Sequence, residues 1–282
     1  MKTLFRHTIK KQVSCEGTGL FTGQKAILTF LPAKIDSGVT FIVNNTRIPA
    51  TLQNVLPQYR RNAIGKDGIV IETIEHLMAA LNGLSITNID IEIAGSNGSK
   101  SVEVPNTDGS AQFFVELLSA AGIEEQRVPK KVLRIKAPVD YKDGECSITA
   151  LPDNNDYLTI DYTFSHPARI IGNQHLSIKI TEDNFISEIA PARTFCMADE
   201  VASLQAQGIG RSANYQNVLV VDNDKIIDNN LRFKDEFVRH KILDLMGDLY
   251  LLNAPVFAKI IAVKTGHKQN IEFVRRLAQD QQ

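Results

Sequence analysis

The stretch Phe237-Val-Arg-His-Lys-Ile-Leu-Asp-Leu-Met-Gly-Asp248 places one histidine and two aspartates at successive four-residue steps. Its apolar residues indicate a helix, in which His240, Asp244 and Asp248 share one face. A histidine and a carboxylate one turn apart can hold a single metal ion, because positions i and i+4 stand side by side. The alternative is a solvent-facing stripe with an ordinary His/Asp contact, and the spacing alone favours that simpler interpretation.

Two further histidines lie at the edges of expected elements. Glu75-His76 lies near the start of a helix-like run from Thr73 to Leu84, and an acid beside a histidine repeats the pairing of zinc hydrolases that use Glu as base. His267 follows a glycine at the junction between an apolar run, residues 257–263, and a final helix-like segment. These positions move the balance toward a metal site.

Composition bounds the class of protein. The chain has 282 residues, of which 43% are hydrophobic and 22% charged, as in an ordinary globular protein of two medium domains. A net charge of -1 gives no electrostatic footprint for nucleic acid or an anionic membrane surface. No apolar run approaches a signal peptide or a membrane span, so we expect a cytoplasmic protein without stable membrane insertion.

The three cysteines are odd in number and far apart, which fits reduced thiols and argues against a disulfide frame or a cysteine zinc site. Any metal must therefore use histidine and carboxylate ligands. These cysteines are Cys15, Cys146 and Cys196.

The order of expected elements indicates an α+β fold. Alternating runs at 26–31, 39–43 and 88–93 are typical of half-buried strands, and helix-like segments follow at 73–84, 110–121, 197–207, 235–252 and 271–279. Strict βαβ alternation is missing, so a doubly wound parallel sheet fits less well. Residues 122–131, with charges and Pro129, are the candidate linker. The halves look weakly alike, which predicts either a duplicated unit or a chance resemblance of two amphipathic helices.

Six motifs together resemble the UDP-3-O-acyl-N-acetylglucosamine deacetylase family, the zinc amidases of lipid A biosynthesis. The resemblance runs in order over nearly the whole chain. It implies two similar α+β domains, residues 1–124 and 130–282, packed as a sandwich with the helices inside and the active site at their interface. The motifs are Glu16-Gly-Thr-Gly-Leu20, Thr73-Ile-Glu-His-Leu-Met-Ala-Ala-Leu81, Asp108-Gly-Ser-Ala111, Ala192-Arg-Thr-Phe195, the block 235–249 and Gly266-His267.

The resemblance implies one Zn²⁺ per chain, held by His76, His240 and Asp244, with Glu75 as general base and His267 as general acid. Three nitrogen and oxygen ligands leave the fourth tetrahedral position open for water, as in a catalytic zinc site. The resemblance further implies that the Thr194 hydroxyl helps bind the oxyanion. Asp248 would keep the general acid His267 charged.

The resemblance also implies the substrate contacts of a monomeric enzyme acting on UDP-3-O-acyl-N-acetylglucosamine. Lys241 and Lys264 would lie near the diphosphate and Phe164 near the uracil, with Phe195 and Gly266 as further contacts. For isolated lysines, a solvated surface position is the ordinary alternative. An acyl passage would lie between residues 194 and 212, where the helical spacing could equally indicate a core-facing stripe; it includes Met197, Val201, Leu204 and Ile209.

Two residues depart from the family pattern: Phe21 stands where a histidine is usual, and Glu200 where an aspartate is common. The contacts of both positions are therefore open. Two rival functions remain: a zinc amidohydrolase acting on another N-acetylated sugar, and a non-catalytic protein that binds a nucleotide sugar or lipid. Glu75 and His267 argue against the second, because binding alone does not require an acid and a base beside a metal.

Overall fold

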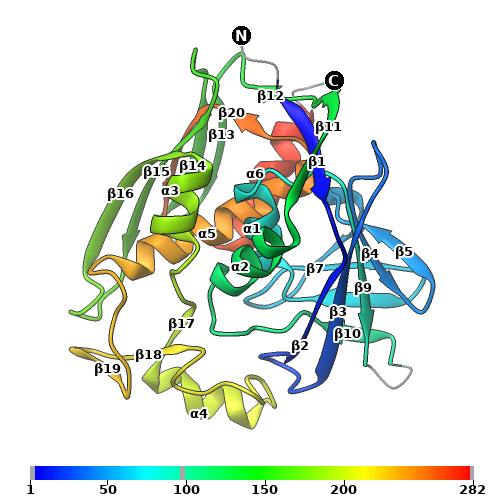
Figure 1. Cartoon of the computed structure of the whole chain (residues 1–282). Helices are drawn as coiled ribbons and strands as arrows, with labels where there is room; N and C mark the ends of the chain where they lie inside the picture. The colour runs from blue at the N-terminus through cyan, green and yellow to red at the C-terminus, as the bar shows by residue number, and fades with distance from the viewer. Residues whose placement is uncertain (1–3, 96–98, 280–282) are drawn as a thin grey trace.

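The computed structural model describes residues 4–95 and 99–279. Two five-stranded sheets form its outer layers, and helices fill the space between them (Figure 1). The first sheet has the order β2-β3-β9-β4-β5, with bounds Val13–Thr18, Lys25–Pro32, Ile89–Ala94, Val39–Val43 and Thr46–Pro49. The second has the order β13-β14-β21-β15-β16, with bounds Val139–Asp143, Cys146–Leu151, Lys259–Val263, Leu158–Ser165 and Asn173–Ile180.

The strands follow the period of two in their sequences. In β3 every second side chain is buried, namely Ala26, Leu28 and Phe30, while the residues between them are wholly or partly exposed. The strand β9 buries its isoleucines in the same way. The three strands expected at 26–31, 39–43 and 88–93 are therefore confirmed to within one residue at either end.

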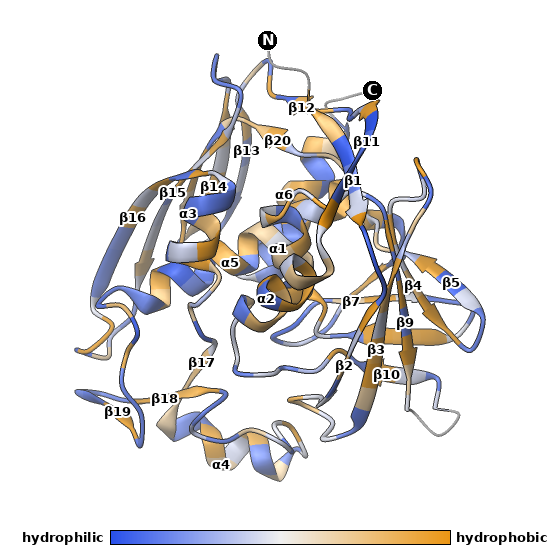
Figure 2. Cartoon of the chain, viewed as in Figure 1, coloured by the Kyte–Doolittle hydropathy of each residue, from blue (hydrophilic) through white to orange (hydrophobic). Residues whose placement is uncertain are grey.

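The helices between the sheets are α1 (Glu75–Gly83), α2 (Gln112–Ala121), α5 (Glu236–Leu249) and α6 (His267–Gln279). Hydrophobic residues colour much of α1 and α2 (Figure 2). Residues 77–81 of α1 are all buried, as in a helix packed on every side. Two predicted boundaries shift: the helix expected over 235–252 ends at Leu249 before a 3-10 turn, Tyr250–Leu252, and the last helix begins four residues early, at His267.

The two halves of the chain repeat one topology. In each sheet the strand that comes fifth along the chain, β9 or β21, lies between the second and the third. It pairs antiparallel with the second and parallel with the third. A helix precedes and another follows that fifth strand in both halves. This agreement favours a duplicated unit over a chance resemblance and confirms the predicted α+β class. We propose residues 1–124 and 130–282 as the two domains.

Each half has additional strands, most of which lie along the chain between the fourth strand of its sheet and the helix α1 or α5. The first half carries the sheet β10-β8-β7-β6, with bounds Ser101–Glu103, Ile69–Glu72, Ala63–Lys66 and Val55–Leu56, and a 3-10 turn at Leu52–Asn54; only β10 comes later in the chain. The second carries β17-β18-β19, with bounds Phe195–Met197, Leu219–Asp222 and Lys225–Ile227, together with α3 (Glu182–Asn184), a π turn (Phe185–Ile189) and α4 (Ala198–Ala206).

The segment expected as a linker is instead a strand. Residues Ile123–Pro129 form β11, which pairs antiparallel with β1 (Phe5–Ile9). The chain thus passes between the halves as part of a two-stranded ribbon. A second small pair joins β12 (Leu133–Arg134) to β20 (Val256–Phe257). The apolar run 257–263 is therefore divided between two strands, β20 and β21. Among the described residues, no helix is long and apolar enough to cross a membrane.

Candidate active site between the two halves

Two histidines and an aspartate meet where α1 packs on α5. His76 comes from the first helix, and His240 and Asp244 lie one turn apart on the second. Asp244 Oδ1 is 3.3 Å from His240 Nε2 and 3.9 Å from His76 Nε2, and all three residues are buried. One potential ligand atom from each residue lies within 4.8 Å of the others, so the group could hold a metal ion.

The chemistry of this group fits a metal. Asp244 Oδ1 is buried and makes no hydrogen bond within the described part of the chain, which leaves an acceptor facing the two imidazoles. His240 Nδ1 lies 3.1 Å from the carbonyl oxygen of Ala192, so Nε2 is free to be the ligand atom. Burial lowers the pKa of His76 to about 3 and also lowers that of His240, so both rings are neutral. Two neutral imidazoles and a carboxylate suit zinc.

Asp244 stays ionised through its neighbours. Burial raises the pKa of its carboxyl, but charged neighbours, the Lys241 ammonium among them, outweigh burial and hold the pKa well below its usual range. Lys241 is itself enclosed, and its Nζ lies 2.8 Å from Asp244 Oδ2. The family resemblance implied a lysine near the diphosphate, with a solvated surface position as the alternative. Most of this side chain is buried against the carboxylate, although it also borders the cavity described below.

Glu75 and His267 lie beside the metal-ligand group, with His267 Nε2 3.8 Å from Glu75 Oε1. Burial raises the pKa of Glu75 to about 7, although the charge of His267 opposes it. Burial lowers the pKa of His267, but the charges of Asp248 and Asp244 outweigh it and raise the pKa to about 10. His267 Nδ1 is 3.0 Å from Asp248 Oδ2, which is the pairing expected from the sequence.

A cavity of about 1140 Å³ opens over these groups. Eleven of the twelve predicted catalytic, metal and substrate residues line it, namely Glu75 and the ten residues that follow. The twelfth, Asp248, is fully buried behind His267. Those ten lining residues are His76, Phe164, Thr194, Phe195, His240, Lys241, Asp244, Lys264, Gly266 and His267. His76 and His267, which are 191 positions apart in the sequence, thus share one cavity.

Comparison with known proteins identifies the chain. The family model of LpxC, described as UDP-3-O-acyl N-acetylglycosamine deacetylase, matches residues 6–279. The chain belongs to this deacetylase family. Among its relatives is a UDP-3-O-acyl-N-acetylglucosamine deacetylase from Thermodesulfovibrio yellowstonii, 40% identical over 275 residues, which are 97% of this chain and 91% of the relative. Deacetylases from Nitratidesulfovibrio vulgaris (39%, covering 97% and 87%) and Syntrophotalea carbinolica (38%, covering 97% and 88%) are similarly close.

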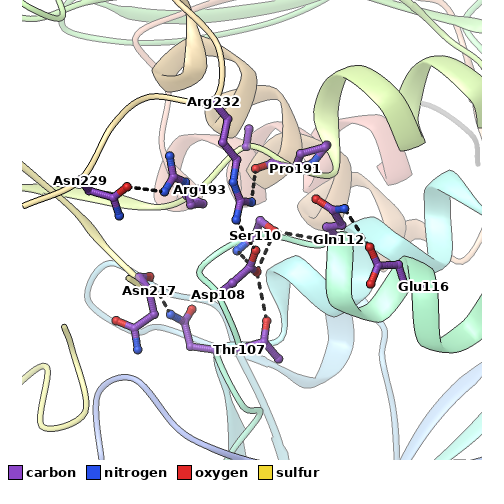
Figure 3. Close-up of polar contacts among 12 residues, drawn as sticks. Thr107, Asp108, Ser110, Gln112, Glu116, Pro191, Arg193, Asn217, Asn229 and Arg232 are labelled. Atoms are coloured by element: carbon purple, nitrogen blue, oxygen red, sulfur yellow. Dashed lines mark hydrogen bonds and ion pairs between the residues drawn. The ribbon is translucent and has the colours of Figure 1, made fainter. Parts of the chain in front are cut away.

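In this member of the deacetylase family, hydrogen bonds from both halves hold the segment 191–194, and Figure 3 shows those at Pro191. Thr194 N donates to the Gly109 carbonyl at 2.8 Å. Arg232 donates through Nη1 to the Pro191 carbonyl at 2.8 Å and through Nη2 to Asp108 Oδ2 at 2.9 Å. Because Ala192 lies inside this segment, the same contacts fix the carbonyl that faces His240. The sequence motif around Asp108 gave no hint of this arrangement.

Residues of the expected acyl passage line the cavity only in part. Leu204 and Ile209 are at its wall, while Met197 and Val201 are not among its lining residues. Met197 instead packs against a small hydrophobic cluster formed by residues 168, 171, 219, 221 and 237. The helical spacing of this segment therefore mixes core-facing and cavity-facing positions.

Both departures from the deacetylase pattern have definite partners. The Arg61 guanidinium lies over the ring of Phe21, 4.2 Å from its centroid. Glu200 accepts a hydrogen bond from Arg60 at 2.6 Å through Oε1, and its Oε2 accepts the backbone N–H of Met197 at the start of α4. Glu200 thus joins α4 to the loop 57–61, and both segments border the cavity.

Proposed function

We propose that this chain is a zinc-dependent hydrolase that removes the N-acetyl group from UDP-3-O-(3-hydroxyacyl)-N-acetylglucosamine. The products are the free amine and acetate, in the committed step of lipid A biosynthesis. The observation that carries the proposal is the group His76, His240 and Asp244 with Glu75 and His267 beside it, in a member of this deacetylase family. The substrate follows from the names of the relatives.

Glu75 is proposed as the general base. A zinc ion held by the three ligands would polarise the acetamide carbonyl and lower the pKa of an attacking water. Glu75 accepts the proton of that water, and its pKa of about 7, raised by burial, suits a base that works near neutral pH. Its position directly before His76 places the carboxylate next to the metal-ligand group.

His267 is proposed as the general acid. An amine leaves poorly unless it is protonated, so the second half of the reaction needs a proton donor. His267 carries that proton at Nε2, while Asp248 holds Nδ1 and keeps the ring cationic. The Thr194 hydroxyl would donate to the developing oxyanion, as a neutral donor near the reacting carbonyl can.

The cavity suits an amphiphilic nucleotide sugar. Phe164 and Phe195 pack at one wall in a tilted arrangement with ring centroids 5.6 Å apart, and aromatic faces suit the uracil base or the sugar. Lys264 Nζ lies 2.9 Å from Glu145 Oε2 near the surface, where it could turn to the diphosphate. Leu204 and Ile209 offer apolar surface to an acyl chain. Because one chain carries all the proposed groups, a monomer can hold the complete site. We propose a monomeric, cytoplasmic enzyme.

Acetate release by purified, metal-assayed protein tests the proposal. We expect about one zinc per chain, acetate from the acylated UDP-sugar, and little acetate from UDP-N-acetylglucosamine, which lacks the acyl chain. Equal turnover of both substrates would favour an amidohydrolase of another N-acetylated sugar. Binding of the acylated substrate without acetate release would favour the non-catalytic alternative.

A further inference from the structure

Four groups form a closed ring at the wall of the cavity: Glu75, His267 and Asn62 line it, and Asp248 lies fully buried behind them. His267 joins the two carboxylates, with Nε2 3.8 Å from Glu75 Oε1 and Nδ1 3.0 Å from Asp248 Oδ2. Asn62 joins them on the other side. Its backbone N–H donates to Glu75 Oε2 at 3.1 Å, and its side-chain Nδ2 donates to Asp248 Oδ1.

The ring crosses between the two halves of the molecule. Asn62 precedes β7 and is anchored there, because its carbonyl accepts the N–H of Thr73 at 2.8 Å. Asp248 belongs to α5, and its other side-chain partners, His267 and Asn270, come from its own half. Among the described side-chain hydrogen bonds of Asp248, the one from the Asn62 amide therefore comes from the half that carries Glu75.

The orientation of Asp248 depends on these donors. A buried carboxylate needs hydrogen bonds to replace those of water, and bonds to an ionised acceptor are among the stronger ones. Asn270 Nδ2 holds Oδ2 at 2.8 Å, and Asn62 holds Oδ1. Without the amide of Asn62, the contact that Oδ1 retains within the described part of the chain is the one to His267 Nδ1, at 3.1 Å. The carboxylate is then fixed by its own half alone and can turn about its contacts to Asn270 and His267.

A turn of Asp248 moves the imidazole of His267 relative to Glu75. Proton transfer requires heavy atoms within hydrogen-bond reach of the reacting group, so a small displacement of an acid or base has a large effect on rate. We propose that Asn62 is a positioning residue, which sets the separation of Glu75 and His267 across the bound substrate through its side-chain amide on Asp248. This inference rests on the proposed function for its kinetic consequence.

Asn82 provides a matched control. Its side-chain amide also crosses between the halves, donating to the Met246 carbonyl of α5 at 2.9 Å, but it does not line the cavity. Asn62→Leu and Asn82→Leu each remove one such hydrogen bond. We expect kcat for acetate release to fall about tenfold or more in Asn62→Leu alone, with KM and zinc content unchanged in both variants.

Asn62→Leu in an Asp248→Asn background adds a second check. Because Asn62 acts through Asp248, the double variant should be no slower than Asp248→Asn alone. If Asn62→Leu does not fold, Asn62→Ser has a side chain too short to reach Asp248 and carries the same expectations. Wild-type kcat in a folded Asn62 variant, or equal losses in the Asn62 and Asn82 variants, would overturn the inference.

The imidazole N–H resonance of His267 separates this inference from the proposed function. Its proton chemical shift reports the bond to Asp248 and needs no substrate. We expect the resonance to move in Asn62→Leu and to stay in place in Asn82→Leu. If the wild-type protein releases no acetate, the proposed function fails while this resonance still decides the role of Asn62. An unmoved resonance in both variants would contradict it.

Discussion

The carboxylate of Asp244 has two oxygen atoms with different surroundings. Oδ2 accepts the ammonium of Lys241 at 2.8 Å, while Oδ1 has no hydrogen-bond partner among the described residues and faces both histidines. An unsatisfied buried acceptor is costly, so its presence beside two neutral imidazoles is best explained by a cation. The neighbouring lysine keeps this aspartate ionised whether or not the cation is bound.

Substitutions at Glu75 and His240 should separate the roles of base and ligand. Glu75→Ala removes the proton acceptor, so we expect turnover to fall about 100-fold or more with zinc retained. His240→Ala removes a ligand and should reduce the zinc content. Metal analysis and acetate release on the same preparations make the comparison. Loss of zinc in Glu75→Ala with full zinc in His240→Ala would reverse the two assignments.

The two titrating groups predict a bell-shaped dependence of kcat/KM on pH, because their pKa values are those of the protein without substrate. As the proposed base, Glu75 must be deprotonated, so kcat/KM rises as pH increases through its pKa of about 7, and a bound cation would move this limb to lower pH. His267 must be protonated, so activity falls as pH increases through about 10. Because the groups interact, the limbs belong to the site as a whole.

Asp248→Asn tests the alkaline limb of that profile. Asp248 contributes the largest charge effect that raises the pKa of His267. Its neutral amide should therefore move the alkaline limb to lower pH and leave the acid limb less affected. An alkaline limb that does not move, measured over the same pH range as the wild type, would remove His267 from the role of acid.

At the scale of elements, Gly247 decides how closely α1 and α5 approach. A Cβ at this position would lie 2.2 Å from the carbonyl oxygen of Glu75. The helix backbone of α5 thus contacts the first residue of α1, which brings His240 and Asp244 to His76. The sequence showed a glycine inside an expected helix, where it normally weakens the helix, and the reason appears only in this crossing.

Gly247→Ala should therefore separate the two helices. Overpacking of this kind costs about 1–3 kcal/mol of stability, and here it also displaces the backbone of Glu75, so kcat should fall too. Gly83→Ala is the control, because its Cβ would meet the side chain of Phe185 at 2.0 Å, away from the cavity. Thermal unfolding should show a loss in both variants. Kinetic loss in Gly83→Ala equal to that in Gly247→Ala would argue against a specific effect on Glu75.

The elements that could be predicted are those whose hydrophobic pattern matches one period. The strand β9 and the helix α5 follow from alternation and from helical spacing. The strand β11 could not, since Ile123-Glu-Glu-Gln-Arg-Val-Pro129 is mostly polar and mostly exposed, which is typical of a connecting segment. Its pairing with β1 supplies the regularity that its own side chains lack.

At the scale of the whole molecule, a bound metal would join the two halves. His76 lies in the first half, and His240 and Asp244 lie in the second. A metal ion held by all three would therefore bind only when the two halves are assembled. Metal at 100 times its dissociation constant stabilises a folded protein by about 2.7 kcal/mol. Chelation should therefore lower the melting temperature by about 5 °C or more.

His76→Ala provides the control for that measurement. This variant lacks the ligand from the first half, so added zinc should change its melting temperature much less than it changes that of the metal-free wild type. The comparison is made by differential scanning calorimetry with and without zinc. Equal responses of the two proteins would mean that the metal does not bridge the halves.

The sequence by itself determined the α+β class of the fold and the one-turn spacing of His240, Asp244 and Asp248 on one helix face. These follow from hydrophobic period and from local spacing, which depend only on neighbours along the chain. Only the tertiary structure decided which of the polar residues act together. Asn62, Asp108 and Asn270 carry no local pattern, because their partners lie in distant segments. The burial that shifts the pKa values of Glu75 and His267 arises only when the two halves close around them.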